Sequence, residues 1–129
     1  MPTQLVSNFV FASIEDDIIM VGFADDEYNT EKHLLLQKSL EFDEQDKELG
    51  QDKVHITYID ELYSSYGGII KLMLKNATAE IHLDKETAKK LRTEEQIEIK
   101  LPKSDYDRDK LIYHLKLMFK EYPNIFSIK

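Results

Sequence analysis

Apolar and polar residues alternate with a period of two in several segments, and this alternation constrains the fold more than any other feature of the sequence. The clearest segments are "AEIHL" at Ala79–Leu83, "QIEIKL" at Gln96–Leu101 and "KVHITYI" at Lys53–Ile59. Successive side chains of a strand point to opposite faces, so each segment offers one face to a core and one to water. The chain is therefore expected to form a sheet with a solvated face.

A further alternating segment, "GIIKLML", directs Ile70, Leu72 and Leu74 to one side. The short polar stretch "KNATA" follows it and leads into Ala79–Leu83. Two alternating runs joined by a few turn-forming residues are typical of a β-hairpin. The sequence predicts a hairpin over Ile70–Leu83.

Three more strand candidates lie in the first forty residues. They are "LVSNFVFASI" at Leu5–Ile14, "DIIMVGFA" at Asp17–Ala24 and "KHLLLQKSL" at Lys32–Leu40. The second is apolar on both faces, as a central or covered strand would be. The triple leucine of the third can also begin a helix, and the acidic stretch after it contains Gly50, which can close a short helical turn.

Two helices follow from capping signals. Asp84 is a plausible N-cap for "KETAKKLR", and Ser104 for the segment that ends before Pro123. Apolar residues recur at helical spacing in the second segment, at Leu111, Leu115, Met118 and Tyr122. We expect one α+β domain over residues 1–129, in which a single, mostly antiparallel sheet carries a short helix and a long C-terminal helix on one face.

Negative charge is concentrated in the first half of the chain. The net charge is −8, and the stretch Glu15–Glu61 holds fifteen acidic residues against four lysines. Such a field repels nucleic acid and anionic membranes and attracts basic partners, although acidic loops can also serve only to keep a protein soluble. The chain has no cysteine, and its N-terminal residues lack a positively charged signal region. We expect a cytoplasmic protein that does not contact membrane.

Motifs for catalysis or metal binding are not evident in the sequence. The four histidines do not show the spacing of a zinc-binding helix, and we interpret them as solvated. A nucleophile elbow, a P-loop and a dinucleotide-binding glycine motif are all missing. We therefore predict no catalytic residue, metal or cofactor. Hydrolysis by Asp60 and Glu61 beside Ser64 remains an alternative.

Tyrosines cluster beside two carboxylates in the middle of the chain. Tyr58, Tyr63 and Tyr66 fall within nine residues and surround Asp60 and Glu61. Tyrosine supplies a large contact area with a polar tip at low conformational cost, so this cluster suits a basic protein partner. The alternative is that the rings close one end of the core, which is the favoured interpretation for Tyr58.

The middle of the chain combines a leucine-glutamine strand, an acidic segment closed by leucine and glycine, an aspartate-led strand and a tyrosine-glycine-glycine-isoleucine turn: Leu36 and Gln37; Asp43, Glu44, Asp46, Leu49 and Gly50; Asp52–Ile59; and Tyr66–Ile69. This combination resembles the immunity protein 10 family, bacterial proteins that neutralise a cognate polymorphic toxin. It implies a non-enzymatic inhibitor whose partner is a toxin domain.

The resemblance and the charge pattern together give a candidate binding site. The residues expected to contact the toxin are Asp43, Glu44, Asp46, Asp60, Glu61 and Tyr63. A basic toxin such as a nuclease fits this field, and the inhibitor is a monomer or a homodimer.

The turn formed by Tyr66, Gly67 and Gly68 is expected to be structural. Its glycines bend the strand and let Tyr66 fold over the sheet. The alternative function is a small-ligand-binding or regulatory domain that uses this turn as the mouth of a pocket.

Overall fold

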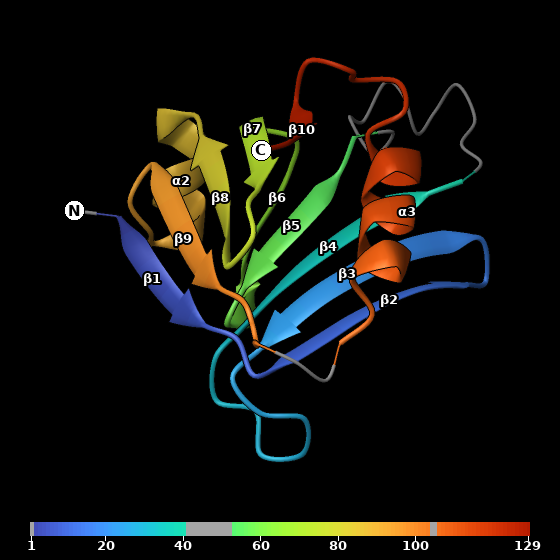
Figure 1. Cartoon of the computed structure of the whole chain (residues 1–129). Coiled ribbons are helices and arrows are strands. Elements are labelled where there is room, and N and C mark those ends of the chain that lie inside the picture. Colours follow the sequence, from blue (N-terminus) through green and yellow to red (C-terminus); the bar gives the residue numbers. More distant parts are fainter. Residues whose placement is uncertain (1, 41–52, 104–105) are drawn as a thin grey trace.

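The computed structural model describes residues 2–40, 53–103 and 106–129, and in these residues the chain forms two five-stranded sheets and two helices (Figure 1). The first sheet is mixed and has the strand order β1-β9-β8-β7-β10. Its strands are β1 (Thr3–Val6), β9 (Gln96–Lys100), β8 (Thr78–Leu83), β7 (Ile69–Leu74) and β10 (Phe126–Ile128). The terminal strands β1 and β10 pair in parallel with β9 and β7.

The second sheet is antiparallel, with the order β2-β3-β4-β5-β6. Its strands are β2 (Phe9–Glu15), β3 (Ile18–Ala24), β4 (His33–Ser39), β5 (His55–Tyr58) and β6 (Asp60–Tyr66). The strand β3, which is apolar on both faces, occupies an interior position, as its sequence predicts. The triple leucine lies in β4, so the strand interpretation of that segment is confirmed and the helix alternative is wrong.

The prediction of a single sheet is wrong because the predicted first strand is divided between the two sheets. The backbone N–H of Ser7 donates to Lys100 O in the mixed sheet, at 2.8 Å. The next N–H, of Asn8, donates to Ala24 O in the antiparallel sheet, at 2.9 Å. The buried Ser7 hydroxyl donates to Phe9 O at 2.9 Å across this corner. Alternation indicates which face of a strand is buried, but it does not specify the partner strand.

Gly67 and Gly68 carry the chain back from the antiparallel sheet to the mixed sheet. Both have left-handed backbone angles, with φ of 80° and 87°. The N–H of Gly67 donates to Val54 O beside β5, and Gly68 O accepts from Asp84 N at the end of β8. A glycine pair fits this position because left-handed backbone costs glycine almost nothing.

The predicted hairpin is present as β7 and β8, but one of its inward assignments is wrong. The register shifts between Ile69 and Lys71, so Ile69 is buried and Ile70 is 53% exposed. A bulge places two residues of one strand opposite one of the other, which reverses the alternation on one side of the shift.

The helices are α2 (Lys85–Leu91) and α3 (Arg108–Met118). Asp84 caps α2 as predicted, since its carboxylate accepts from Thr87 N at 2.7 Å. The prediction of a long C-terminal helix capped by Ser104 is wrong. The side chain of Asp107 caps α3 by accepting from Lys110 N at 3.0 Å, and the helix has only 11 residues.

Beyond α3 the chain turns to place β10 on the edge of the mixed sheet. The backbone N–H of Leu72 in β7 donates a hydrogen bond to Ile125 O at 2.9 Å, and Phe126 pairs with Leu72 in the parallel register. Tyr122 and Pro123 therefore lie in the connection rather than in the helix. The pairing of β10 with β7 is a tertiary interaction, and the helical spacing of apolar residues in this segment does not predict it.

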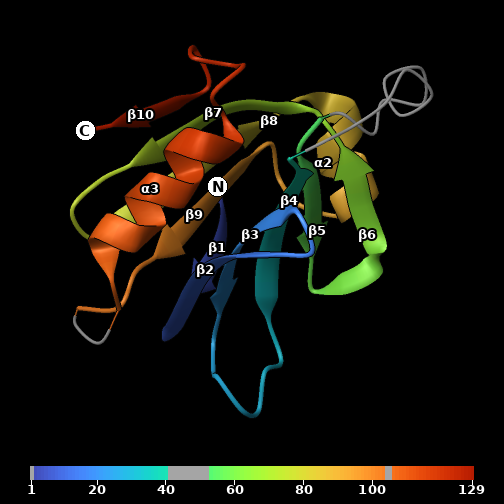
Figure 2. The same cartoon turned by 90° about the vertical axis from the view of Figure 1, so that its right-hand side faces the viewer.

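One hydrophobic core joins the two sheets and α3. The helix contributes Leu111, Leu115 and Met118, which pack with the inward residues of both sheets. Figure 2 shows α3 on the side of the antiparallel sheet where β7 and β10 also lie. The opposite face of the antiparallel sheet is therefore directed away from this core.

Candidate functional site

Two strand connections with acidic residues in or beside them lie at the same end of the antiparallel sheet (Figure 1). The β3–β4 loop spans residues 25–32, and the β5–β6 turn is the single residue Ile59. They are neighbours because Ala24 pairs with His33, and the N–H of Ile59 donates to His33 O at 2.8 Å. We call this region the acidic end, and its acidic residues are Asp25, Asp26, Glu27, Glu31, Asp60 and Glu61.

Two aspartates hold the β3–β4 loop in a defined shape. Asp25 Oδ1 accepts from the N–H groups of Glu31 and Lys32, at 3.0 and 3.1 Å. Asp26 Oδ1 accepts from those of Asn29 and Tyr28, at 3.0 and 2.9 Å, and these bonds lower the pKa of Asp26 below its ordinary value. The loop presents Tyr28, which is 86% exposed.

The β5–β6 turn is strained. Ile59 has a φ of 69°, in the left-handed region that β-branched residues rarely adopt. The turn is tight enough for Tyr58 to pair with Asp60. The carboxylate of Asp60 then accepts from Leu62 N at 3.0 Å, and the side chain of Leu62 is 83% exposed. Strain beside an exposed apolar side chain is typical of a functional segment.

The predicted contact residues Asp60, Glu61 and Tyr63 all lie on β6, the edge strand of the antiparallel sheet. Asp60 and Glu61 are exposed. Tyr63 is half-buried under the guanidinium of Arg92, whose Cζ lies 4.6 Å from the ring centre. Asp43, Glu44 and Asp46 lie outside the described residues, as does the predicted turn at Gly50.

Tyr58 and Tyr66 have different environments from Tyr63. Tyr58 is buried, which confirms its interpretation as a core residue, and burial raises the pKa of its hydroxyl. Tyr66 stands at the other end of β6, where its ring contacts that of His55 at 4.6 Å between centres. Burial lowers the pKa of His55.

The cavity beside Gly67 and Gly68 is small. It measures about 90 Å³ and is lined mainly by apolar side chains from β7 and the segment after α3, including Ile69, Phe119 and Ile125. Pockets for drug-sized ligands usually exceed about 300 Å³. The geometry does not favour the glycine turn as the mouth of a ligand pocket.

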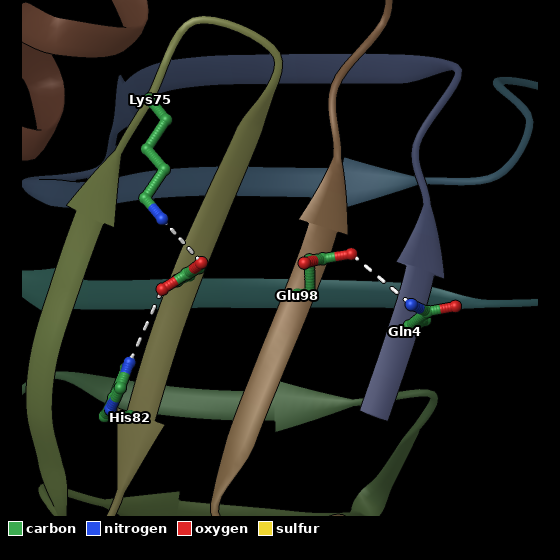
Figure 3. Close-up of polar contacts among 5 residues, drawn as sticks. Gln4, Lys75, His82 and Glu98 are labelled. Atoms are coloured by element: carbon green, nitrogen blue, oxygen red, sulfur yellow. Dashed lines mark hydrogen bonds and ion pairs between the residues drawn. The ribbon is translucent and has the colours of Figure 1, made fainter. Parts of the chain in front are cut away.

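The histidines are less solvated than the sequence suggests. His114 is buried, with Nδ1 2.7 Å from Lys110 O, so its interpretation as a solvated residue is wrong. On the outer face of the mixed sheet, Glu80 binds Lys75 Nζ at 2.7 Å and lies 3.7 Å from His82 Nε2 (Figure 3). The hydrogen bond from Lys75 is the main reason that the pKa of Glu80 is lowered. Among the described residues, no group of three or more acidic, histidine or cysteine side chains is arranged to hold a metal ion.

Sequence reasoning missed the exposed Leu62 and the strained Ile59. Leu62 lies beyond the strand predicted at Lys53–Ile59, and its exposure follows from the edge position of β6. Ile59 carries no sequence signal for a left-handed turn, since glycine, asparagine or aspartate usually occupies such a position.

Comparison with known proteins identifies the family. The family model described as immunity protein 10 matches residues 6–109. The chain belongs to the immunity protein 10 family. Membership implies a non-enzymatic protein that neutralises a cognate toxin, as the sequence predicts. A search of curated proteins gave no match.

A membrane-spanning helix would need a longer apolar stretch than either helix provides. Across residues 2–40, 53–103 and 106–129, no helix has the length and hydropathy to cross a membrane.

Proposed function

We propose that this chain neutralises its toxin by direct binding through the acidic end of the antiparallel sheet. The observation that supports the proposal is the juxtaposition of the acidic loop at residues 25–32 with Asp60 and Glu61 at the start of β6, where the exposed side chains of Tyr28 and Leu62 each follow a glutamate. Carboxylates around exposed aromatic and aliphatic side chains provide charge attraction together with apolar area. The segment containing Asp43, Glu44 and Asp46 adds negative charge to the same protein.

A basic toxin is the natural partner for this surface. The acidic field accelerates encounter with a positively charged protein, by roughly 10- to 1,000-fold at low salt. Nucleases suit this description because they bind a polyanion and carry basic active-site surfaces. An acidic inhibitor seated on such a surface would exclude the nucleic acid. The complex forms in the cytoplasm, with the chain acting as one domain over residues 1–129.

The carboxylates of the acidic end differ in their expected roles. Asp25, Asp26 and Asp60 accept backbone hydrogen bonds, so they shape the surface. Glu27, Glu31 and Glu61 are exposed, and their charge is available to a partner. Substituting the glutamates tests the charge of the acidic end while preserving its backbone.

Co-expression of this chain with the toxin domain encoded beside it tests the proposal. The expected result is survival of the cells and co-purification of a complex that weakens as salt is raised. Death of the cells together with failure to co-purify at low salt would overturn direct binding. A complex whose affinity does not change with salt would overturn the electrostatic part.

A further inference from the structure

The outer faces of the two sheets differ in chemistry. The outer face of the mixed sheet is polar, and Gln4, Glu80 and Glu98 follow one row across it (Figure 3). The strand register places sixteen residues on the outer face of the antiparallel sheet: Phe9, Phe11, Ser13, Glu15, Ile18, Met20, Gly22, Ala24, His33, Leu35, Gln37, Ser39, His55, Thr57, Ser64 and Tyr66. We call these residues the aromatic face.

The register of the strands shows that these residues share a side. Phe11 pairs with Gly22, Gly22 with Leu35 and Leu35 with Thr57. Their inward neighbours along the strands, including Val21 and Leu36, are fully buried in the core. Side chains alternate along a strand, so the row that begins at Phe11 points away from that core.

Glu15, at one end of β2, is the single Asp, Glu, Lys or Arg of the aromatic face as defined here, although these four types make up 33% of the chain. About five charged residues would be expected among sixteen positions at that frequency. An antiparallel sheet that faces water usually carries polar residues on that side. Depletion of charge with enrichment of aromatic residues and methionine is instead the composition of an interface centre.

Phe11 has a fixed place on this face because Gly22 makes room for its ring. A Cβ at Gly22 would lie 2.1 Å from Phe11 Cε1. The ring of Phe9 lies beside that of Phe11, with 5.9 Å between centres. Next to these rings is a hollow of about 210 Å³, whose walls include Leu35 and His33 and whose rim includes Glu27 of the β3–β4 loop.

We propose that the aromatic face is the centre of the toxin-binding surface and that this hollow receives a lysine or arginine side chain of the toxin; the inference rests on the proposed function. The apolar walls suit the aliphatic stem of such a side chain, and phenylalanine rings attract a cation. Among the residues that line the hollow in the described part of the chain, Glu27 alone supplies a carboxylate. The hollow therefore offers both apolar contact and a charge partner to a basic side chain.

The charge of the chain favours a toxin over a second copy on this face. Three of the five strands, β3, β4 and β5, lie within the region from Glu15 to Glu61, which holds fifteen acidic residues and four lysines. Docking two copies through the aromatic face would bring these regions together, and like charges across an interface oppose association. A basic partner gains attraction from the same charges.

The aromatic face and the acidic end should have separable kinetic roles. The β3–β4 loop connects the central strands of the aromatic face to the acidic end, so the two surfaces are continuous. Exposed charges at the rim of an interface act mainly on the association rate, whereas buried anchors at the centre act mainly on the dissociation rate. Removing Phe11 should therefore shorten the lifetime of the complex.

The test measures association and dissociation rates between the purified full-length chain and the toxin domain encoded beside it. The variants are Phe11→Ala, which removes the ring, and Gly22→Ala, which displaces it. Phe11→Leu keeps apolar volume and covers the case in which Phe11→Ala does not fold. Tyr113→Ala is the matched control, because Tyr113 is an aromatic residue on α3 that is 60% exposed. Circular dichroism and thermal melting establish that each variant is folded.

The expected result is that dissociation accelerates about tenfold or more in the Phe11 and Gly22 variants and stays unchanged in Tyr113→Ala. If the wild type binds the toxin, and folded Phe11→Leu and Gly22→Ala dissociate from it at the wild-type rate, this inference is overturned and the proposed function stands. A wild type that neither protects cells nor binds the toxin would instead overturn the proposed function. The inference would also be overturned if the chain self-associates and Phe11→Ala abolishes this self-association without changing toxin binding. The aromatic face would then bind a second copy of the chain.

Discussion

The backbone of Gly68 lies so close to the side chain of Thr87 that a Cβ on Gly68 would be 1.7 Å from Thr87 Oγ1. This contact fixes the first turn of α2 against the point where the chain passes from the antiparallel sheet to the mixed sheet. Asp84, which caps α2, also donates its backbone N–H to Gly68 O. The glycine turn therefore joins the two sheets and the helix at one position.

Substitution of Gly68 by alanine should destabilise the protein by about 2–4 kcal/mol, because left-handed backbone and overpacking each carry a cost. Gly67→Ala is the matched control. Its φ is also positive, but the added Cβ would meet the flexible side chain of Lys53 at 2.8 Å, so a loss of about 1–2 kcal/mol is expected. Urea unfolding of the two variants measures the difference. Equal losses would contradict the role given to the contact between Gly68 and Thr87.

Ile59→Asn should raise stability by about 0.5–1 kcal/mol, since asparagine tolerates the left-handed backbone that isoleucine resists. Ile70→Asn is the control, as Ile70 is similarly exposed on β7 but has no positive φ. The control should be neutral or destabilising. Thermal melting compares the two variants, and a lower melting temperature for Ile59→Asn would show that Ile59 is not strained.

Stability should fall as the pH is lowered from 7 towards 5, in part through His55. Burial lowers the pKa of His55 below its ordinary value of 6.5. The unfolded chain therefore binds this proton at a higher pH than the folded chain, and stability is lost from about pH 6.5 down to the folded pKa. His55→Gln should reduce this loss. Unfolding midpoints across the range measure it, and an unchanged pH profile would contradict the assignment.

The ring of Tyr66 covers one side of His55, so its removal provides a second measurement. Tyr66→Ala should raise the pKa of His55 by exposing the imidazole. An NMR titration of His55 reports this directly. A pKa that stays the same or falls would show that Tyr66 does not shield the ring.

Neutralising Asp43, Glu44 and Asp46 to Asn, Gln and Asn should slow association with the toxin several-fold at low salt and leave dissociation nearly unchanged. Stopped-flow mixing with the toxin domain measures both rates. Unaltered association would remove this segment from the binding surface.

Local features of the fold were predictable from sequence, whereas the pairing of the strands was not. The cap at Asp84, the interior position of β3 and the β7–β8 hairpin all follow from residues close together in the chain. The pairing of Ser7 with the mixed sheet depends on Lys100, about ninety residues away, and the position of β10 depends on Leu72, about fifty residues away. Period-two alternation does not report such distances.

The candidate site was predictable in part for the same reason. Asp60, Glu61 and Tyr63 stand out as a local cluster of charge and aromatic residues. The aromatic face depends on the pairing register of β2, β3 and β4, which places Phe11, Gly22 and Leu35 in one row. The segment "FVFA" in β2 has apolar residues on both faces of the strand, which is a signal for an apolar outer face. The same pattern also indicates a fully buried strand.

The association rate of the toxin with a glutamate triple variant tests the central claim most directly. Glu27, Glu31 and Glu61 are replaced by glutamine in one variant, and the exposed residues Glu94, Glu95 and Glu121 are replaced by glutamine in a control of the same net charge. The account predicts that the first variant associates roughly tenfold more slowly at low salt than the control and that high salt removes the difference. Equal rates for the two variants at low salt would contradict binding through the acidic end.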